Sequence, residues 1–269
     1  MIYLKSETEI ELMREAAQLV SRTLGEVAKH IEPGISTGRL DRIAEEYISK
    51  YNARPAFKGY GSPGNPFPAT LCISVNEEVV HGIPGPRVLE EGDIVSIDCG
   101  VEKNGYFGDH AYTFMVGECD DETRRLLKVS LQSLYLGIDQ AIHGNKIGDI
   151  SSAVQQHCET AGFGVVRQLV GHGLGKNLHE DPTVPNYGRK GRGERLRNGM
   201  TLAVEPMVTA GNWKIRTKND GWTIVTTDGS KAAHFEHDIV VREGNAEILS
   251  TFDYITEITK NELLDSQYG

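Results

Sequence analysis

The two halves of this 269-residue chain resemble each other in sequence. Leu89-x-x-Gly92 precedes an apolar run that ends at Asp98, and Leu196-x-x-Gly199 precedes an apolar run that ends at Glu205. In both halves the carboxylate stands six residues after the glycine. A motif of this kind before a strand is common by chance, so this match alone does not establish a repeat.

A second match lies upstream of the first. Residues 36–40 read Ser-Thr-Gly-Arg-Leu and residues 147–150 read Ile-Gly-Asp-Ile, at an offset near 110 and again where a helix is expected to begin. A similar offset across a helix and a strand favours internal duplication. We therefore predict one domain over residues 1–250, built from two similar halves of about 1–118 and 119–250, with a cleft where they meet.

Helical and strand-like patterns alternate in each half. Apolar residues at helical spacing predict helices over 7–31, from about 37 to 51, over 121–143 and over 147–161. Strand-like segments are expected at 70–80, 93–101, 106–116, 165–171, 200–209, 222–227 and 232–241. Helices that alternate with hairpins predict an α+β fold, with a mostly antiparallel sheet and helices on one face. The polar segment after residue 250 is expected to add little to the core.

Composition limits the classes of function. A hydrophobic content of 39% and a charged content of 25% are typical of a soluble globular protein, and no apolar stretch is long enough to span a membrane. The N-terminus does not resemble a signal peptide, and the four scattered cysteines suit reduced thiols in the cytoplasm. A net charge of −10 argues against bulk attraction to nucleic acid. We expect a cytoplasmic monomer that binds neither DNA nor membranes.

Asp98 and Asp109 flank a predicted hairpin. If Lys103-Asn104 forms the turn, the two side chains are directly opposite, and if Asn104-Gly105 forms it, they are diagonal neighbours. Both registers place them on the same face of the sheet. Two bare carboxylates there repel each other, and Asp98 ends an apolar run where an unpaired charge is costly. A bound cation would neutralise both, although an exposed face would let water solvate them.

The second half supplies three further candidate ligands. His172 lies between two glycines, Glu205 ends an apolar strand before Pro206, and Glu236 lies in another strand. Each alone has an ordinary explanation as a loop or solvent-facing residue. Together with the two aspartates they provide four carboxylates, which can balance and bridge two divalent ions. Mostly oxygen ligands with one imidazole suit Mn, Fe, Co or Zn.

Seven motifs between about residues 5 and 249 resemble the methionine aminopeptidases. They are Val80-His81-Gly82-Ile83-Pro84, the Asp98-to-Asp109 hairpin, Gly171-His172-Gly173-Leu174-Gly175, His179-Glu180-x-Pro182, Val204-Glu205-Pro206-Met207, Asp220-Gly221-Trp222 and His234-Phe235-Glu236-His237. Each motif alone is weak, whereas their common order is specific. The gap from His172 to Glu205 lacks the helical insertion of type II enzymes, and the sequence shows no zinc-binding or long charged N-terminal extension, so the resemblance is to the short, type I form.

The resemblance implies the pita-bread (creatinase/aminopeptidase) fold, in which a pseudo-twofold, curved sheet carries helices on its outer face. It implies an enzyme that removes the N-terminal methionine from nascent proteins and prefers a small second residue. Asp98 would bind one metal, His172 and Glu205 the other, and Asp109 and Glu236 would bridge both.

The implied chemistry is attack on the first peptide bond by a hydroxide that the two metals share. Glu205 would move the proton, and His179 would donate to the carbonyl oxygen as it gains charge. His81 would contact the substrate backbone, although without the resemblance either histidine could be a packed structural residue. The predicted walls of the methionine pocket are Tyr60, Phe67, Cys72 and Trp222.

The chain departs from the usual type I pattern around this pocket. The loop 60–67 is longer than usual, Phe67 stands where a tyrosine is frequent, and Leu178 stands where a phenylalanine is common. Two alternatives share the fold: an Xaa-Pro aminopeptidase or dipeptidase, which usually carries an extra N-terminal domain, and a binding protein that has lost catalysis. The basic loop 189–197 is either a solvated, mobile loop or a site that docks transiently on the ribosome.

Overall fold

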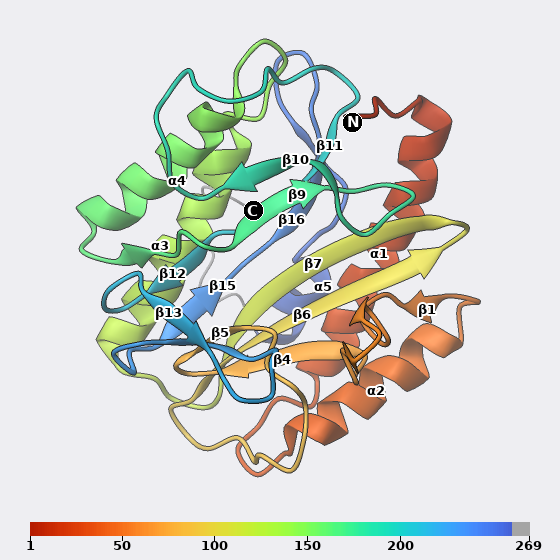
Figure 1. Cartoon of the computed structure of the whole chain (residues 1–269). Helices are drawn as coiled ribbons and strands as arrows, with labels where there is room; N and C mark the ends of the chain where they lie inside the picture. The colour runs from red at the N-terminus through yellow and green to blue at the C-terminus, as the bar shows by residue number, and fades with distance from the viewer. Residues whose placement is uncertain (260–269) are drawn as a thin grey trace.

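Each half of the chain begins with a pair of helices, as the repeat predicts (Figure 1). The computed structural model describes residues 1–259. The first pair is α1 (Glu7–Ala28) and α2 (Thr37–Ser49), and the second is α3 (Asp121–Ile138) and α4 (Ile147–Thr160). All four lie where apolar periodicity predicts them, although α3 ends five residues early. The predicted boundary near residue 118 falls between the last strand of the first half and α3, while the grouping of residues 1–250 into one domain stays a prediction.

The first helix shows how local sequence and packing agree. Ser6 caps α1: its hydroxyl accepts from the Glu9 N–H at 3.4 Å, and Glu9 accepts from the Ser6 N–H at 2.9 Å. This reciprocal pair satisfies two donors that a helix start leaves unpaired. The helix packs against the hairpin of the first half, where a Cβ on Gly108 would lie 2.4 Å from the Ala17 nitrogen. A glycine is therefore needed for this close approach.

The first half contributes a sheet in which β6 (Ile94–Lys103) pairs with β7 (Tyr106–Met115), with β4 (Leu71–Val75) and with the short β1 (Arg54–Pro55). Lys103 pairs with Tyr106, so Asn104 and Gly105 form the hairpin turn. Both turn residues have positive φ, at 53° and 79°, which is the geometry of a type I′ turn.

The second half forms a five-stranded sheet in the order β10-β9-β11-β16-β17. Its strands are β9 (Val170–Gly173), β10 (Glu180–Pro185), β11 (Thr201–Val204), β16 (His237–Val240) and β17 (Glu247–Ile248). A three-stranded sheet of the second half pairs β12 (Met207–Thr209) with β15 (Ala232–His234) and β8 (Gly164–Val165). Another three-stranded sheet joins the halves, because β14 (Ile224–Thr226) pairs with β13 (Ile215–Thr217) and with β5 (Glu78–Val80) of the first half. A small ribbon pairs β2 (Gly61–Ser62) with β3 (Asn65–Pro66).

Every pair of named strands within residues 1–259 is antiparallel, and the helices lie outside the strands (Figure 1). Helix α1 packs on β6 and β7, whereas α3 packs on β11, β12 and β15. The predicted α+β class with a mostly antiparallel sheet is therefore confirmed. Six strands were not predicted, because each is short or polar: β1, β2, β3, β10, β13 and β17.

Matching backbone contacts occur at the start of the second helix in each half. In each half a loop strand pairs with the residue that begins the second helix, through an antiparallel bridge between Ser36 and Val88 and another between Lys146 and Arg195. Three backbone N–H to O bonds of the first half each have an equivalent in the second. Gly34 to Leu89 (2.8 Å) matches Gly144 to Leu196 (3.0 Å). Likewise, Thr37 to Arg87 (2.9 Å) matches Ile147 to Glu194 (3.0 Å), and Gly38 to Gly85 (2.8 Å) matches Gly148 to Arg192 (2.8 Å). These three backbone bonds and the bridge occur at equivalent positions in both halves.

The expectation that the segment after residue 250 adds little to the core is wrong for its first part. Phe252 and Ile255 are buried in the main hydrophobic core, and α5 (Asp253–Thr259) packs against α1. Two apolar side chains three positions apart are enough to anchor one turn of helix, although the surrounding sequence is polar. The remaining residues of the predicted tail 251–269, from 260 onward, lie outside the described residues.

Within residues 1–259, none of the helices combines the length and the apolar character that crossing a bilayer requires.

Candidate active site

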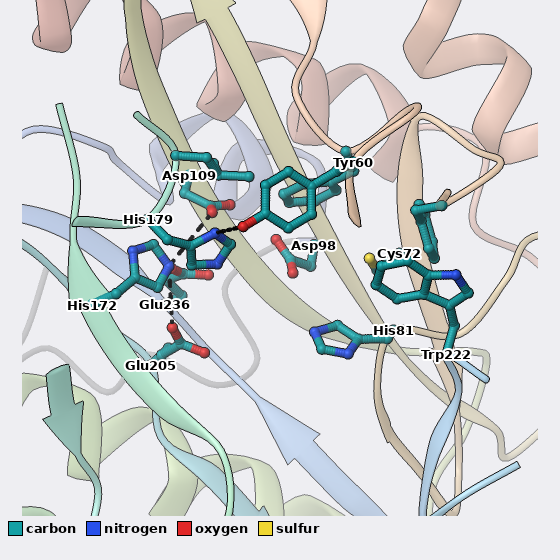
Figure 2. A pocket seen from close by; sticks show the side chains of 13 residues that line it. Tyr60, Cys72, His81, Asp98, Asp109, His172, His179, Glu205, Trp222 and Glu236 are labelled. Atoms are coloured by element: carbon teal, nitrogen blue, oxygen red, sulfur yellow. Dashed lines mark hydrogen bonds and ion pairs between the residues drawn. The ribbon is translucent and has the colours of Figure 1, made fainter. Parts of the chain in front are cut away.

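A cavity of about 290 Å³ lies between the two halves, and it is lined by residues from both (Figure 2). Every residue that the sequence predicts for the site lines it, together with Phe57 and Leu178. The predicted residues are Tyr60, Phe67, Cys72, His81, Asp98, Asp109, His172, His179, Glu205, Trp222 and Glu236. The cleft expected at the junction of the halves is therefore present.

The carboxylates and one imidazole gather at one end of this cavity. Ligand atoms of Asp109, His172 and Glu236 all lie within 4.8 Å of one another. His172 Nε2 is 3.5 Å from Glu205 Oε1 and 3.9 Å from Asp109 Oδ2. Asp98 lies beside this group, on the side of the cavity that leads to His81 (Figure 2).

The hairpin register decides how the two aspartates meet. Asp98 lies opposite Ala111, and Asp109 lies opposite Gly100, so the two are diagonal neighbours on one face. Of the two predicted registers, the one with Asn104-Gly105 as the turn is correct.

Both glutamates stand where the chain leaves one sheet for another. The predicted strand 200–209 is split at Glu205-Pro206 into β11 and β12, and the predicted strand 232–241 is split at Phe235-Glu236 into β15 and β16. The Glu236 N–H still donates to Ala111 O at 3.0 Å, which ties this break to the aspartate hairpin. A carboxylate at such a break can turn into the cleft instead of alternating across a flat sheet.

The acidic cluster has no counter-charge among the side chains that the structure describes. Among residues 1–259, no lysine or arginine forms an ion pair with Asp98, Asp109, Glu205 or Glu236. Burial raises the pKa of Asp98 to about 7. Burial and the neighbouring carboxylates together raise the pKa values of Asp109, Glu205 and Glu236 well above their usual range.

Two oxygen atoms of the cluster, Asp98 Oδ1 and Glu236 Oε1, are buried without any hydrogen-bond partner among the described residues. Buried acceptors are normally satisfied, so these atoms indicate a missing partner. His172 Nδ1 is 2.9 Å from Gly173 O, so Nδ1 carries the ring proton and Nε2 presents a lone pair to the carboxylates. The donor set therefore fits divalent cations.

The two candidate catalytic histidines, His179 and His81, are neutral, and the backbone directs the ring of His81 into the cavity. Burial lowers the pKa of His179, and burial together with the charge of His179 lowers the pKa of His81 to about 4. His81 has a φ of +59°, an uncommon left-handed conformation that directs its ring into the cavity (Figure 2). The next residue, Gly82, allows this turn, because a Cβ there would lie 2.1 Å from Ile73 O.

Tyr60 does more than wall the pocket. Its hydroxyl lies 2.6 Å from His179 Nδ1, and Figure 2 shows the tyrosine ring reaching across the cavity to that histidine. Nothing in the sequence indicates this contact, because the two residues are 119 positions apart.

The other end of the cavity is apolar. Phe57, Phe67, Cys72 and Leu178 form one buried cluster, and the ring of Trp222 meets Phe67 edge-on at 5.2 Å. Phe57 and Leu178 were missing from the predicted walls. Leu178 was noted only as a departure from the usual pattern around the pocket, and its position directly before His179 indicates that it lines the cavity.

A cleft between related halves that gathers carboxylates and imidazoles beside an apolar pocket is the site of a metal-dependent hydrolase. Comparison with known proteins agrees: residues 11–243 match metallopeptidase family M24. The methionine aminopeptidase of Clostridium acetobutylicum is 52% identical over 251 residues, which cover 93% of this chain and 99% of that protein. Methionine aminopeptidase 1 of Bacillus subtilis is 51% identical, with coverages of 93% and 99%.

Solved structures give the same result. The crystal structure of methionine aminopeptidase from Thermotoga maritima matches with a TM-score of 0.90 and 47% identity, over 93% of this chain and 100% of that chain. The chain belongs to metallopeptidase family M24 and, within it, to the methionine aminopeptidases.

The X-Pro aminopeptidase of Thermotoga maritima shares the fold alone, with a TM-score of 0.73 and 23% identity over 92% of this chain and 62% of that chain. The predicted pita-bread fold and the resemblance stated from the sequence are confirmed, and the chain is a hydrolase.

Proposed function

We propose that this protein removes the N-terminal methionine from nascent polypeptides, with a preference for a small second residue. The observation that carries the proposal is the convergence of all eleven predicted site residues on one cavity, in a chain about half identical to proteins named methionine aminopeptidases. The apolar end of the cavity offers aromatic and sulfur contacts, which suit a methionine side chain.

Two divalent ions are the proposed cofactors. Asp98 would hold one ion, His172 and Glu205 the other, and Asp109 and Glu236 would be shared. Four carboxylates balance the charge of two such ions, and the buried, unpartnered oxygen atoms of Asp98 and Glu236 support this arrangement. The donor set suits Mn, Fe, Co or Zn.

When bound, these ions would supply an acidified water and polarise the scissile carbonyl. Glu205 borders the same space and is the proposed proton carrier. If the Tyr60 hydroxyl donates to His179 Nδ1, the neutral ring carries its own proton on Nε2. That N–H would then donate to the carbonyl oxygen as it gains charge. His81, also neutral, would contact the substrate backbone.

Activity on two peptides tests the proposal. The metal-free protein is reconstituted with each candidate ion in turn and assayed on Met-Ala-Ser and on Ala-Pro-Ala. Cleavage of the first peptide alone supports a methionine aminopeptidase. Cleavage of the second would support the Xaa-Pro alternative, and retention of two ions without cleavage of either would support a non-catalytic binding protein.

We further propose a cytoplasmic, monomeric enzyme that meets its substrates near the ribosome through the basic loop 189–197. Its five basic side chains, Arg189, Lys190, Arg192, Arg195 and Arg197, are exposed. The loop backbone is anchored to the start of α4, because Gly148 N donates to Arg192 O at 2.8 Å and Gly191 N donates to Asp149 Oδ1 at 2.8 Å. Salt-sensitive cosedimentation with ribosomes that is lost when three of these arginines are changed to glutamate would support docking, and unchanged cosedimentation would contradict it.

A further inference from the structure

In addition to His81, His172 and His179, a fourth histidine, His234, lies beside the acidic cluster without lining the cavity. It ends β15 and is 2% exposed. Its Nε2 atom is 3.8 Å from Glu205 Oε2 and 3.9 Å from Glu236 Oε2. This Nε2 has no hydrogen-bond partner among the described residues. The imidazole therefore lies beside two carboxylates that line the cavity, whereas it does not line the cavity itself.

The backbone of His234 is fixed on both sides. Its N–H donates to Thr113 Oγ1 at 2.9 Å, and that hydroxyl donates to His234 O at 2.8 Å. His234 also pairs with Met207, the first residue of β12 and the second after Glu205. These contacts fix His234 next to the two points where the chain passes from one sheet to another, at Glu205 and at Glu236.

The surroundings of His234 favour the tautomer that carries a proton on Nε2. A lone pair on Nε2 would face two carboxylate oxygens and be repelled. A proton on Nε2 would instead face two acceptors, and a small rotation of either carboxylate would close a hydrogen bond.

We propose that His234 donates from Nε2 to the Oε2 atoms of Glu205 and Glu236, and that it thereby positions both carboxylates for the metal ions. This inference rests on the metal ligands proposed above. Donors behind a metal-binding carboxylate orient it and reduce its mobility, and their loss typically costs ~10–100-fold in metal affinity or activity. Because Glu205 is also the proposed proton carrier, loss of the donor should lower kcat more than it raises KM.

A pair of variants of similar length tests the donor directly. His234→Gln keeps an N–H group at the end of an unbranched side chain, whereas His234→Met has nearly the same length and no donor. Calorimetric titration of the metal-free proteins with Mn²⁺ is the main readout, with kcat and KM for Met-Ala-Ser as the second. We expect His234→Met to bind Mn²⁺ ~10–100-fold more weakly than wild type, and His234→Gln to restore most of that loss.

The control is His157→Met. His157 Nε2 is also buried without a hydrogen-bond partner among residues 1–259, but this residue lies on α4 and does not line the cavity. Its substitution should leave Mn²⁺ affinity unchanged. Thermal unfolding of the metal-free variants separates loss of fold from loss of the donor, and if His234→Met does not fold, a metal affinity of His234→Gln far below wild type still overturns the proposal.

Equal Mn²⁺ affinity in wild type and folded His234→Met overturns the proposal, and so does a His234→Gln variant as weak as His234→Met. Failure of the proposed function looks different, because wild-type protein itself would then bind fewer than two ions or leave Met-Ala-Ser intact.

Discussion

Asp98 and Asp109 lie diagonally across the β6–β7 hairpin on the same face, and within residues 1–259 neither forms an ion pair with a lysine or arginine. The type I′ turn at Asn104-Gly105 sets this register, and a slip of one residue would move one carboxylate to the opposite face. The metal-free protein therefore holds these carboxylates, together with Glu205 and Glu236, in an unfavourable arrangement that should be visible in its stability.

The stability of the metal-free protein should fall as the pH rises from about 7 to 9. Burial raises the pKa values of Asp109, Glu205 and Glu236 well above their unfolded values, so the folded state binds more protons than the unfolded state, and the free energy of unfolding decreases with pH. Buried histidines act in the opposite direction, since burial lowers the pKa of His172 to about 3, but they do so mainly below the unfolded value of 6.5.

Thermal unfolding of EDTA-treated protein across this pH range measures the effect. Asp109→Asn, which removes one of the repelling charges, should flatten the dependence of Tm on pH, and saturating Mn²⁺ should do the same in wild type. A Tm of the metal-free protein that stays constant or rises from pH 7 to 9 would contradict the prediction.

Glu236→Ala should abolish turnover and leave the fold intact. Glu236 is the carboxylate proposed to be shared by both ions, and its side chain lies in the cavity beside His172. Metal content after dialysis and kcat on Met-Ala-Ser are the measurements. Glu243→Ala changes an exposed glutamate nearby in sequence and should behave as wild type; a Glu236→Ala enzyme with normal kcat would rule out the shared role.

His179→Ala should lower kcat by ~10²-fold or more, because it removes the proposed donor to the developing oxyanion. Tyr60→Phe should lower kcat less, by up to about tenfold, since it removes one hydrogen bond that orients the His179 ring. Steady-state kinetics on Met-Ala-Ser compares the two. If Tyr60→Phe has no effect, the hydroxyl does not set the tautomer, and if His179→Ala has no effect, the donor role is wrong.

Ile255→Ala should destabilise the protein by ~2–5 kcal/mol, the usual cost of emptying a buried isoleucine site. Ile255 is fully buried in α5, whereas Ile258 in the same helix is 40% exposed. Ile258→Ala is therefore the matched control and should change stability by no more than ~0.5 kcal/mol. Denaturant titration measures both variants, and equal losses would mean that α5 does not anchor the C-terminal segment.

The local elements follow from the sequence because their causes are local. The periodicity of α1 to α4 and the Asn104-Gly105 turn both act over a few residues, and a strand period of two places Asp98 and Asp109 on one face in either register. The repeat between the halves was visible for the same reason, since it copies short motifs. The site residues could be named because seven motifs occur in a recognisable order.

The tertiary structure alone decided how these pieces meet. The contact between Tyr60 and His179, the burial of Ile255 and the place of His234 beside Glu205 and Glu236 all join segments far apart in the chain. Such contacts depend on how two sheets and their helices close around one cleft, and no local pattern of residues records that closure. The order of the motifs in the sequence thus predicted which side chains form the site. The distances between these side chains and their contacts with one another are set by tertiary packing.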